Sequence, residues 1–298
     1  MKYKQLGKSD LNISEVSFGC MSLQGDEEES IKMLHQALDK GINFFDTADL
    51  YDKGQNESVV GRAFKGMREK VVLATKVGNQ WRPDGSGWDW NPSKAYILQA
   101  VEESLKRLQT DYIDLYQLHG GTIDDPIDET IEAFEQLKEQ GKIRHYGISS
   151  IRPNVIREYV SRSNIASVML QYSLLDRRPE EEVLELLQQH QIGVLARGSM
   201  AQGLLADKPA KSYLTYTLEE VQQAAEAVKV VAGKTRRASE TAVRFVLHHP
   251  SVTSAVLGIR TEQQLEDALL AAQAEPLTDA EVRQLQEVLA AGKYEQHR

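Results

Sequence analysis

Short apolar runs alternate with longer amphipathic stretches along most of this chain. The apolar runs end abruptly in polar residues, as buried strands do where they leave a core. Between the runs, apolar residues recur at intervals of three and four residues, which is the spacing of one helix face. The pattern predicts strands that alternate with helices, and such alternation is typical of a parallel sheet.

The pattern predicts eight strands and a larger number of helices. The predicted strands cover residues 15–19, 42–46, 71–76, 112–118, 143–149, 166–172, 192–197 and 252–258. The predicted helices cover residues 27–40, 56–66, 93–108, 126–140, 153–162, 179–190, 218–232, 238–249 and 277–291. Eight such strands indicate an α/β fold of the (β/α)8 TIM barrel type, with additional C-terminal helices.

Residues 3–13 precede the repeats and have the turn residues of an N-terminal β-hairpin. We expect this hairpin to plug the floor of the barrel. No low-complexity linker divides the chain, so residues 1–298 are predicted to form a single barrel domain.

Composition narrows the classes of function. The formal net charge of -9 argues against a general nucleic-acid binder, because a phosphate backbone would be repelled on average. Cys20 is the only cysteine, so neither an intrachain disulfide nor a cysteine metal cluster is expected. The chain shows neither a signal-peptide pattern nor a membrane span, which predicts a cytoplasmic protein.

Candidate chemistry lies where three successive predicted strands end. Asp46 ends the run 42–46 and Tyr51 follows five positions on, Lys76 ends the next run, and His119 follows the run 112–118. In a barrel of parallel strands these ends are neighbours on one rim, and that rim holds the active site. We expect the four side chains to converge there.

The four groups form a plausible acid–base set for carbonyl reduction. Tyr51 would be the general acid, and a Lys76 cation beside it is expected to lower its pKa from about 10. Asp46 would keep Lys76 charged, while His119 would orient the substrate oxygen or share in the proton relay. None of these groups can donate a hydride, so the scheme requires a bound nicotinamide. Any one of them alone would more commonly be a cap or an ion pair.

Several motifs together resemble the aldo-keto reductase family, in its bacterial branch related to potassium-channel β subunits. They are Asp-Thr-Ala-Asp-Leu-Tyr at 46–51, Ala-Thr-Lys at 74–76, Asp-Leu-Tyr-Gln-Leu-His at 114–119, Gly-Ile-Ser-Ser at 147–150 and Gly-Ile-Arg at 258–260 with Gln264. The resemblance runs from about residue 3 to residue 290. It implies an (α/β)8 barrel, NADPH as cofactor and hydride transfer to an aldehyde or ketone, with Tyr51 as the acid and Asp46, Lys76 and His119 in support.

The resemblance also implies a cofactor site. Ser149, Ser150 and Gln171 match contacts to the nicotinamide carboxamide, and Arg197 stands where many relatives have an aromatic residue, so that guanidinium stacking would replace ring stacking. The positions assigned to the cofactor in full are Gly19, Cys20, Met21, Ser149, Ser150, Gln171, Arg197, Gly198, Ser199, Met200, Gln202, Gly203, Gly258, Arg260, Gln264 and Asp267.

The adenosine end of that predicted site departs from the family in two places. Asp267 replaces the usual glutamate, and Ala268 replaces an asparagine, so one hydrogen bond to adenine is expected to be missing. Arg260 favours NADPH over NADH, since a fixed guanidinium suits a 2′-phosphate. The alternative for Arg260 is a surface charge at a helix start.

All three tryptophans, Trp81, Trp88 and Trp90, lie in one segment just after Lys76. On the catalytic rim they would form a wall or lid over a substrate, or they would pack the loop onto the barrel.

Two functions of different class remain from the sequence. The first is a reductase acting on a small carbonyl compound, as a monomer without a metal. The second is a nucleotide-sensing regulatory or interaction subunit of the channel β-subunit type. The presence of all four catalytic groups favours the reductase.

Overall fold

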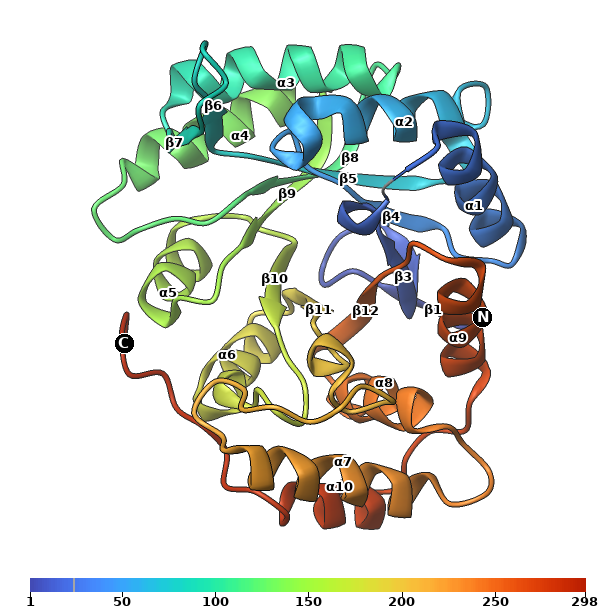
Figure 1. Cartoon of the computed structure of the whole chain (residues 1–298). Helices are drawn as coiled ribbons and strands as arrows, with labels where there is room; N and C mark the ends of the chain where they lie inside the picture. The colour runs from blue at the N-terminus through green and yellow to red at the C-terminus, as the bar shows by residue number, and fades with distance from the viewer. Residues whose placement is uncertain (24) are drawn as a thin grey trace.

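Eight parallel strands close into a barrel at the centre of the computed structural model, which describes residues 1–23 and 25–298 (Figure 1). Around the barrel the strand order is β10-β11-β12-β3-β4-β5-β8-β9. The strands are β3 (Val16–Gly19), β4 (Phe44–Asp46), β5 (Val72–Val77), β8 (Ile113–Leu118), β9 (Ile143–Ser149), β10 (Ser167–Gln171), β11 (Gly193–Arg197) and β12 (Val252–Gly258). The predicted TIM barrel is confirmed.

Helices surround the barrel in the order in which they follow the strands (Figure 1). They are α1 (Glu27–Asp39), α2 (Gln55–Phe64), α3 (Lys94–Leu108), α4 (Ile127–Glu139), α5 (Pro153–Arg162), α6 (Val183–Gln189), α8 (Ala238–His248) and α9 (Glu262–Gln273). The additional helices α7 (Leu218–Ala232) and α10 (Asp279–Gln286) pack together outside this ring.

Three helix predictions need correction. The predicted helix 179–190 divides into a short 3-10 turn, Arg178–Glu181, and α6, because Glu182 leaves helical geometry. The predicted helix 277–291 ends at Gln286, and beyond it the Tyr216 hydroxyl donates to Ala290 O and accepts from Gly292 N. Helix α9 was not predicted, because its buried face consists largely of alanines and gives a weak apolar pattern.

The N-terminal hairpin plugs the barrel floor, as predicted. It pairs β1 (Tyr3–Gln5) with β2 (Asn12–Ser14), and its apolar side chains are buried inside the barrel. Gly7 in its turn has φ +55°, and a Cβ atom there would lie 2.6–2.7 Å from backbone atoms of Ala166, Gln191 and Gly193. This close approach requires glycine. The barrel interior comprises Leu6, Leu11, Ile13, Phe44, Ala74, Leu115, Met169, Leu195 and Val256.

The inward-facing side chains at mid-barrel also show which residues face inward at the carboxyl ends of the strands. Side chains alternate between the two faces of a strand, so a residue two positions beyond an inward-facing one also faces the barrel axis. Phe44, Ala74 and Leu115 face inward at mid-barrel. Asp46, Lys76 and Gln117 therefore face inward at the carboxyl rim.

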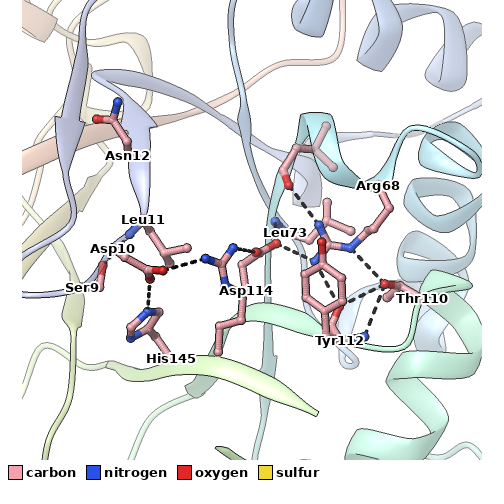
Figure 2. A network of polar contacts seen from close by, with 12 residues as sticks. Ser9, Asp10, Leu11, Asn12, Arg68, Leu73, Thr110, Tyr112, Asp114 and His145 are labelled. Atoms are coloured by element: carbon pink, nitrogen blue, oxygen red, sulfur yellow. Dashed lines mark hydrogen bonds and ion pairs between the residues drawn. The ribbon is translucent and has the colours of Figure 1, made fainter. Parts of the chain in front are cut away.

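Asp114 organises a polar network at the amino end of the strands (Figure 2). It is 1% exposed and accepts hydrogen bonds from Arg68 at 2.5 Å, from the Leu73 backbone N–H at 2.9 Å and from Arg144 at 3.0 Å. Arg144 also donates to Asp10 of the hairpin turn, at 2.8 Å. The network ties the hairpin to β5, β8 and β9.

The helices of the described residues, 1–23 and 25–298, include none with the length and apolar character needed to cross a bilayer.

We predict that Asp114→Asn lowers the free energy of unfolding by about 3 kcal/mol, because it removes the carboxylate from two arginines. Equilibrium urea denaturation measures this loss. The matched control is Asp10→Asn, whose carboxylate is 68% exposed and pairs with the same Arg144, so at most about 1 kcal/mol is expected. Equal losses in the two variants would contradict the central place of Asp114.

Candidate active site

The buried ammonium group of Lys76, on β5, bonds to residues at the end of β4 and just after it. Lys76 Nζ donates to Asp46 Oδ2 at 2.7 Å, to Thr47 O at 2.8 Å and to the Tyr51 hydroxyl at 3.1 Å. Lys76 is 1% exposed and Asp46 is 4% exposed. Since both face inward on neighbouring strands, the barrel places them in direct contact.

Tyr51 reaches Lys76 through an unusual turn. It opens the 3-10 turn Tyr51–Gly54, in which Asp52 and Lys53 have left-handed backbone at φ 48° and 52°, followed by Gly54 at φ 86°. Lys76 Nζ lies 4.9 Å from the centroid of the Tyr51 ring. The phenol and the ammonium are therefore in contact on the barrel rim.

His119 completes the group from β8. Its backbone N–H donates to Val77 O at 2.7 Å, which continues the β5–β8 pairing by one residue. Its ring meets the Tyr51 ring edge to face, with centroids 5.8 Å apart. Asp46, Tyr51, Lys76 and His119 thus lie together, at the carboxyl ends of three strands that are adjacent in the barrel or just beyond them.

Burial and charge set the protonation states of these groups. Burial raises the pKa of Tyr51 and outweighs the opposing effect of the Lys76 charge, so the expectation of a lowered phenol pKa is wrong. Burial alone would lower the pKa of Lys76, but the Asp46 carboxylate reverses this and keeps Lys76 a cation. Burial, with the charges of Lys76 and Arg197, lowers the pKa of His119 to about 3. At neutral pH the phenol and the imidazole are both uncharged.

The positions assigned to the cofactor lie on the other strands of the rim. They follow the neighbouring strands β9, β10, β11, β12 and β3. At their centre, Arg197 Nη1 donates to Gln171 Oε1 at 3.2 Å, and Gln171 Nε2 donates to the Tyr213 hydroxyl at 2.7 Å. Ser149 ends β9, and Ser150 is buried beside it. The guanidinium of Arg197 is exposed and free to stack on a ligand.

The loop after β11 has features of an anion site. Gly198 and Gly203 have positive φ, and so do Ala201 at 47° and Gln202 at 61°, a conformation that costs of order 1–3 kcal/mol for a residue with a side chain and is typical of functional sites. Ser199 Oγ is buried and finds no hydrogen-bond partner among the described residues. A hydroxyl donor and a curved backbone fit the pyrophosphate of a dinucleotide.

A small cavity lies at the predicted adenosine end, between α8 and α9. Met200, Gly258, Gln264, Asp267 and Ala268 are among its lining residues. Because Ala268 offers only a methyl group, it cannot supply a side-chain hydrogen bond to a base.

Charged groups stand around that cavity. Arg260 is exposed beside it, with its backbone N–H donating to Gln264 Oε1 at 3.0 Å. Asp267 forms an ion pair with Arg237 at 2.8 Å. An arginine at position 260 can bind an anionic group.

Three further positions assigned to the cofactor, Gly19, Cys20 and Met21, lie at the end of β3 and just after it, and they differ in how exposed they are. The Cys20 side chain is fully buried in the core, with Sγ 3.9 Å from Phe18 O, so only its backbone can face a ligand. Gly19 is buried, and a Cβ atom on it would lie 3.2 Å from Leu257 O. Met21 is 63% exposed. Of the three, Met21 alone presents a side chain at the surface.

The tryptophan segment forms a hairpin, β6 (Asn79–Trp81) paired with β7 (Trp88–Trp90). Trp90 packs against Gly78 and Gly120 and donates Nε1–H to Asp125 at 2.9 Å, so it holds the hairpin to the barrel. Trp88 is 47% exposed, and Trp81 lies under Lys53, whose Nζ is 5.3 Å from its ring centroid. The structure therefore shows the packing role for Trp90, while the substrate wall stays a prediction for Trp81 and Trp88.

Several residues around the site were missed from the sequence. Gln117 Nε2 donates to Asp46 Oδ1 at 3.2 Å, and its inward place in an apolar run could have identified it. Thr47, Asn56 and Tyr213 form hydrogen bonds with other residues of the site, and no pattern in the sequence indicates them. Among the described residues, no group of three His, Cys, Asp or Glu side chains is arranged to hold a metal ion.

The comparisons with known proteins agree with this geometry. The model of the aldo/keto reductase family matches residues 15–290. The chain is 51% identical to the uncharacterized oxidoreductase YqkF of Bacillus subtilis (strain 168), over all of both chains. It is 33% identical to aldo-keto reductase YhdN of the same organism, over 89% of this chain and 87% of that one.

A solved structure is also similar over the whole length. The holo form of aldo-keto reductase AKR11C1 from Bacillus halodurans superposes with a TM-score of 0.96 at 52% identity, covering 100% of this chain and 99% of that chain. Its apo form gives a TM-score of 0.88 over the same shares. The fold and the rim therefore define an oxidoreductase built on a TIM barrel. More specifically, the chain belongs to the aldo/keto reductase family.

We predict that His119 makes the fold sensitive to acid. In the unfolded chain its pKa is about 6.5, so it gains a proton below that pH, whereas the folded imidazole gains one only near pH 3. The free energy of unfolding therefore falls as pH falls through this window, by up to about 1.4 kcal/mol per pH unit. Urea denaturation between about pH 6 and 4 should show a shallower fall for His119→Asn than for the wild type. Parallel curves would contradict a neutral buried imidazole.

Proposed function

We propose that this chain is an NADPH-dependent reductase that converts aldehydes or ketones into alcohols, with Tyr51 as the general acid. The contact that supports this most directly is the 3.1 Å approach of the Tyr51 hydroxyl to Lys76 Nζ, with His119 edge-on to the same ring. A phenol that is neutral at pH 7 and touches a permanent cation is suited to donate a proton.

The chain's own residues would act on the carbonyl oxygen. The reduced nicotinamide, when bound, supplies the hydride to the carbonyl carbon. Tyr51 donates its proton to the oxygen, and the Lys76 charge stabilises the phenolate that remains. Asp46 holds Lys76 charged and directed at the phenol, while the neutral His119 has one N–H with which to orient the oxygen. Tyr51 then regains a proton from solvent.

The cofactor assignment rests on residues of the opposite half of the rim. Arg197, Gln171, Ser149 and Ser150 surround the place for the nicotinamide, and the loop from Gly198 to Gly203 follows for the pyrophosphate. The higher TM-score to the holo form of AKR11C1, 0.96 against 0.88 for the apo form, supports a conformation suited to cofactor. Arg260 is the basis for choosing NADPH.

Trp81 and Trp88 are proposed as a substrate wall, since Trp81 lies under Lys53 of the Tyr51 turn and Trp88 pairs with Trp81 across the hairpin, and Trp90 as their structural anchor. The branch related to potassium-channel β subunits, the single domain, the monomeric state and the cytoplasmic location stay predictions of the sequence.

We predict that Tyr51→Phe lowers kcat by about 10²–10⁴-fold, the range for loss of a general acid. NADPH consumption with a panel of aldehydes, diketones and quinones measures turnover, and fluorescence titration should show cofactor binding within about twofold of the wild type. Tyr112→Phe is the matched control, because Tyr112 packs on Arg68 at the opposite end of the barrel. Turnover of Tyr51→Phe at the wild-type rate would overturn the proposed acid.

We predict that Arg260→Ala weakens NADPH binding by about 10–100-fold and leaves NADH binding nearly unchanged, since only NADPH carries the 2′-phosphate. Titration of both cofactors measures the two affinities. Arg283→Ala, an exposed arginine on α10, is the control. An equal loss for NADPH and NADH would show that Arg260 does not recognise the 2′-phosphate.

A further inference from the structure

We propose that the buried ion pair Glu57–Arg107 is a positioning pair for Tyr51, because it fixes the turn that carries the phenol against the strand that carries Lys76. The inference rests on the proposed role of Tyr51 as general acid. It assigns a catalytic consequence to two residues that touch neither substrate nor cofactor.

The turn Tyr51–Gly54 needs support from outside. Its two left-handed residues with side chains, Asp52 and Lys53, cost of order 1–3 kcal/mol each, so the turn keeps this shape only where surrounding contacts hold it. A relaxed turn would carry the Tyr51 hydroxyl away from Lys76 Nζ.

Glu57 supplies the first of these contacts. It lies in the first turn of α2, directly after the Tyr51 turn, and is 0% exposed. Its Oε1 accepts from Thr75 Oγ1 at 2.5 Å, while Oε2 accepts from Arg107 Nε at 2.7 Å and from Ser104 Oγ at 3.3 Å. Thr75 precedes Lys76 on β5. The Glu57 carboxylate thus joins the Tyr51 segment to the neighbour of the ammonium that Tyr51 must meet.

Arg107, from the last turn of α3, supports the turn sterically as well. A Cβ atom on Gly54 would lie 2.8 Å from Arg107 Cδ and Nε. The arginine side chain therefore passes directly beneath the backbone of the turn, and its charge neutralises Glu57. Removal of Arg107 would leave the Glu57 carboxylate, which is 0% exposed, without a counter-charge, and this is strongly unfavourable.

Asn56 anchors the same helix turn on the other side. Its Oδ1 accepts from Thr47 Oγ1 at 2.6 Å, and its Nδ2 donates to Cys20 O at 2.8 Å. Thr47 follows Asp46 and also accepts from Lys76. Asn56 and Glu57 therefore attach the start of α2 to the chain neighbours of Asp46 and of Lys76. We expect Asn56 to keep the helix in place when Glu57 is altered, so that the change is confined to the turn.

The test is Glu57→Gln, which keeps the side-chain volume and an acceptor for Thr75 but removes the charge opposite Arg107. We expect kcat to fall at least tenfold, with NADPH affinity within twofold of the wild type, because the cofactor positions lie on β9 to β3. In a Tyr51→Phe background the same change should lower the residual rate less than twofold, since a residue that acts through Tyr51 has nothing left to position.

Glu15→Gln is the matched control. It breaks a pair that is buried on both sides, Glu15–Arg244, whose atoms are 3.0 Å apart and whose side chains are both 4% exposed, at the amino end of the barrel. It should lower the melting temperature and leave kcat within twofold. The comparison distinguishes the general effect of breaking a buried ion pair from the specific effect of breaking Glu57–Arg107.

If Glu57→Gln does not fold, Thr75→Val tests the proposal in its place. This substitution removes one hydrogen bond to Glu57 and keeps the shape of the side chain. A several-fold fall in kcat that Thr75→Ser restores is expected. The proposal is overturned if folded Glu57→Gln, or Thr75→Val in its place, turns over at the wild-type rate, or if Glu57→Gln costs as much in the Tyr51→Phe background as alone. Failure of the proposed function is seen separately, as full turnover in Tyr51→Phe by itself.

Discussion

The ion pair between Lys76 and Asp46 is the constraint on which the site depends. An ammonium that is 1% exposed costs several kcal/mol unless it is paired and hydrogen-bonded, and Lys76 finds a carboxylate, a carbonyl and a phenol within 3.1 Å. The pairing follows from the barrel, because two inward-facing residues at the ends of neighbouring parallel strands have no other direction to point. The hairpin side chains fill the barrel floor below them, and Tyr51 and His119 are half-buried at the rim.

In the proposed function the rim divides into two halves with different tasks. Strands β4, β5 and β8 are neighbours and carry the acid–base groups, whereas β9, β10, β11, β12 and β3 carry the positions proposed for the cofactor. Arg197 stands close enough to both halves to lower the pKa of His119. In the proposed function this division places a reduced nicotinamide across the barrel mouth from the phenol, with the carbonyl between them.

The sequence predicted the parts of this arrangement that depend on local pattern. Apolar runs located all eight strands, and a polar residue at the end of a buried run identified Asp46, Lys76 and His119. The contact between Tyr51 and Lys76 was predicted as well, but the turn that makes it was not, because left-handed backbone at Asp52 and Lys53 has no counterpart in the apolar pattern. Helix α9 was not predicted because alanines form most of its buried face and give a weak apolar pattern.

Burial caused the other failures of prediction. A lysine beside a tyrosine suggests a lowered phenol pKa, yet the desolvation of the phenol is larger than the effect of the charge. Glu57 looks from the sequence like an ordinary acidic residue at a helix start. Only the packing of α2 against α3 and its hydrogen bond from Thr75 of β5 show that it is fully buried. Trp81, Trp88 and Trp90 are alike in sequence, and the turn between β6 and β7 gives them separate environments.

One measurement tests the central claim directly: a single turnover of an aromatic aldehyde with reduced nicotinamide cofactor that carries deuterium at C4, followed by mass spectrometry and NMR of the product. If the reduced nicotinamide delivers its hydride to the carbonyl carbon at this rim as proposed, a cofactor with both C4 hydrogens replaced by deuterium leaves one deuterium on the former carbonyl carbon of the alcohol. An alcohol without deuterium at that carbon, or labelled cofactor recovered unchanged beside unreacted aldehyde, would contradict it.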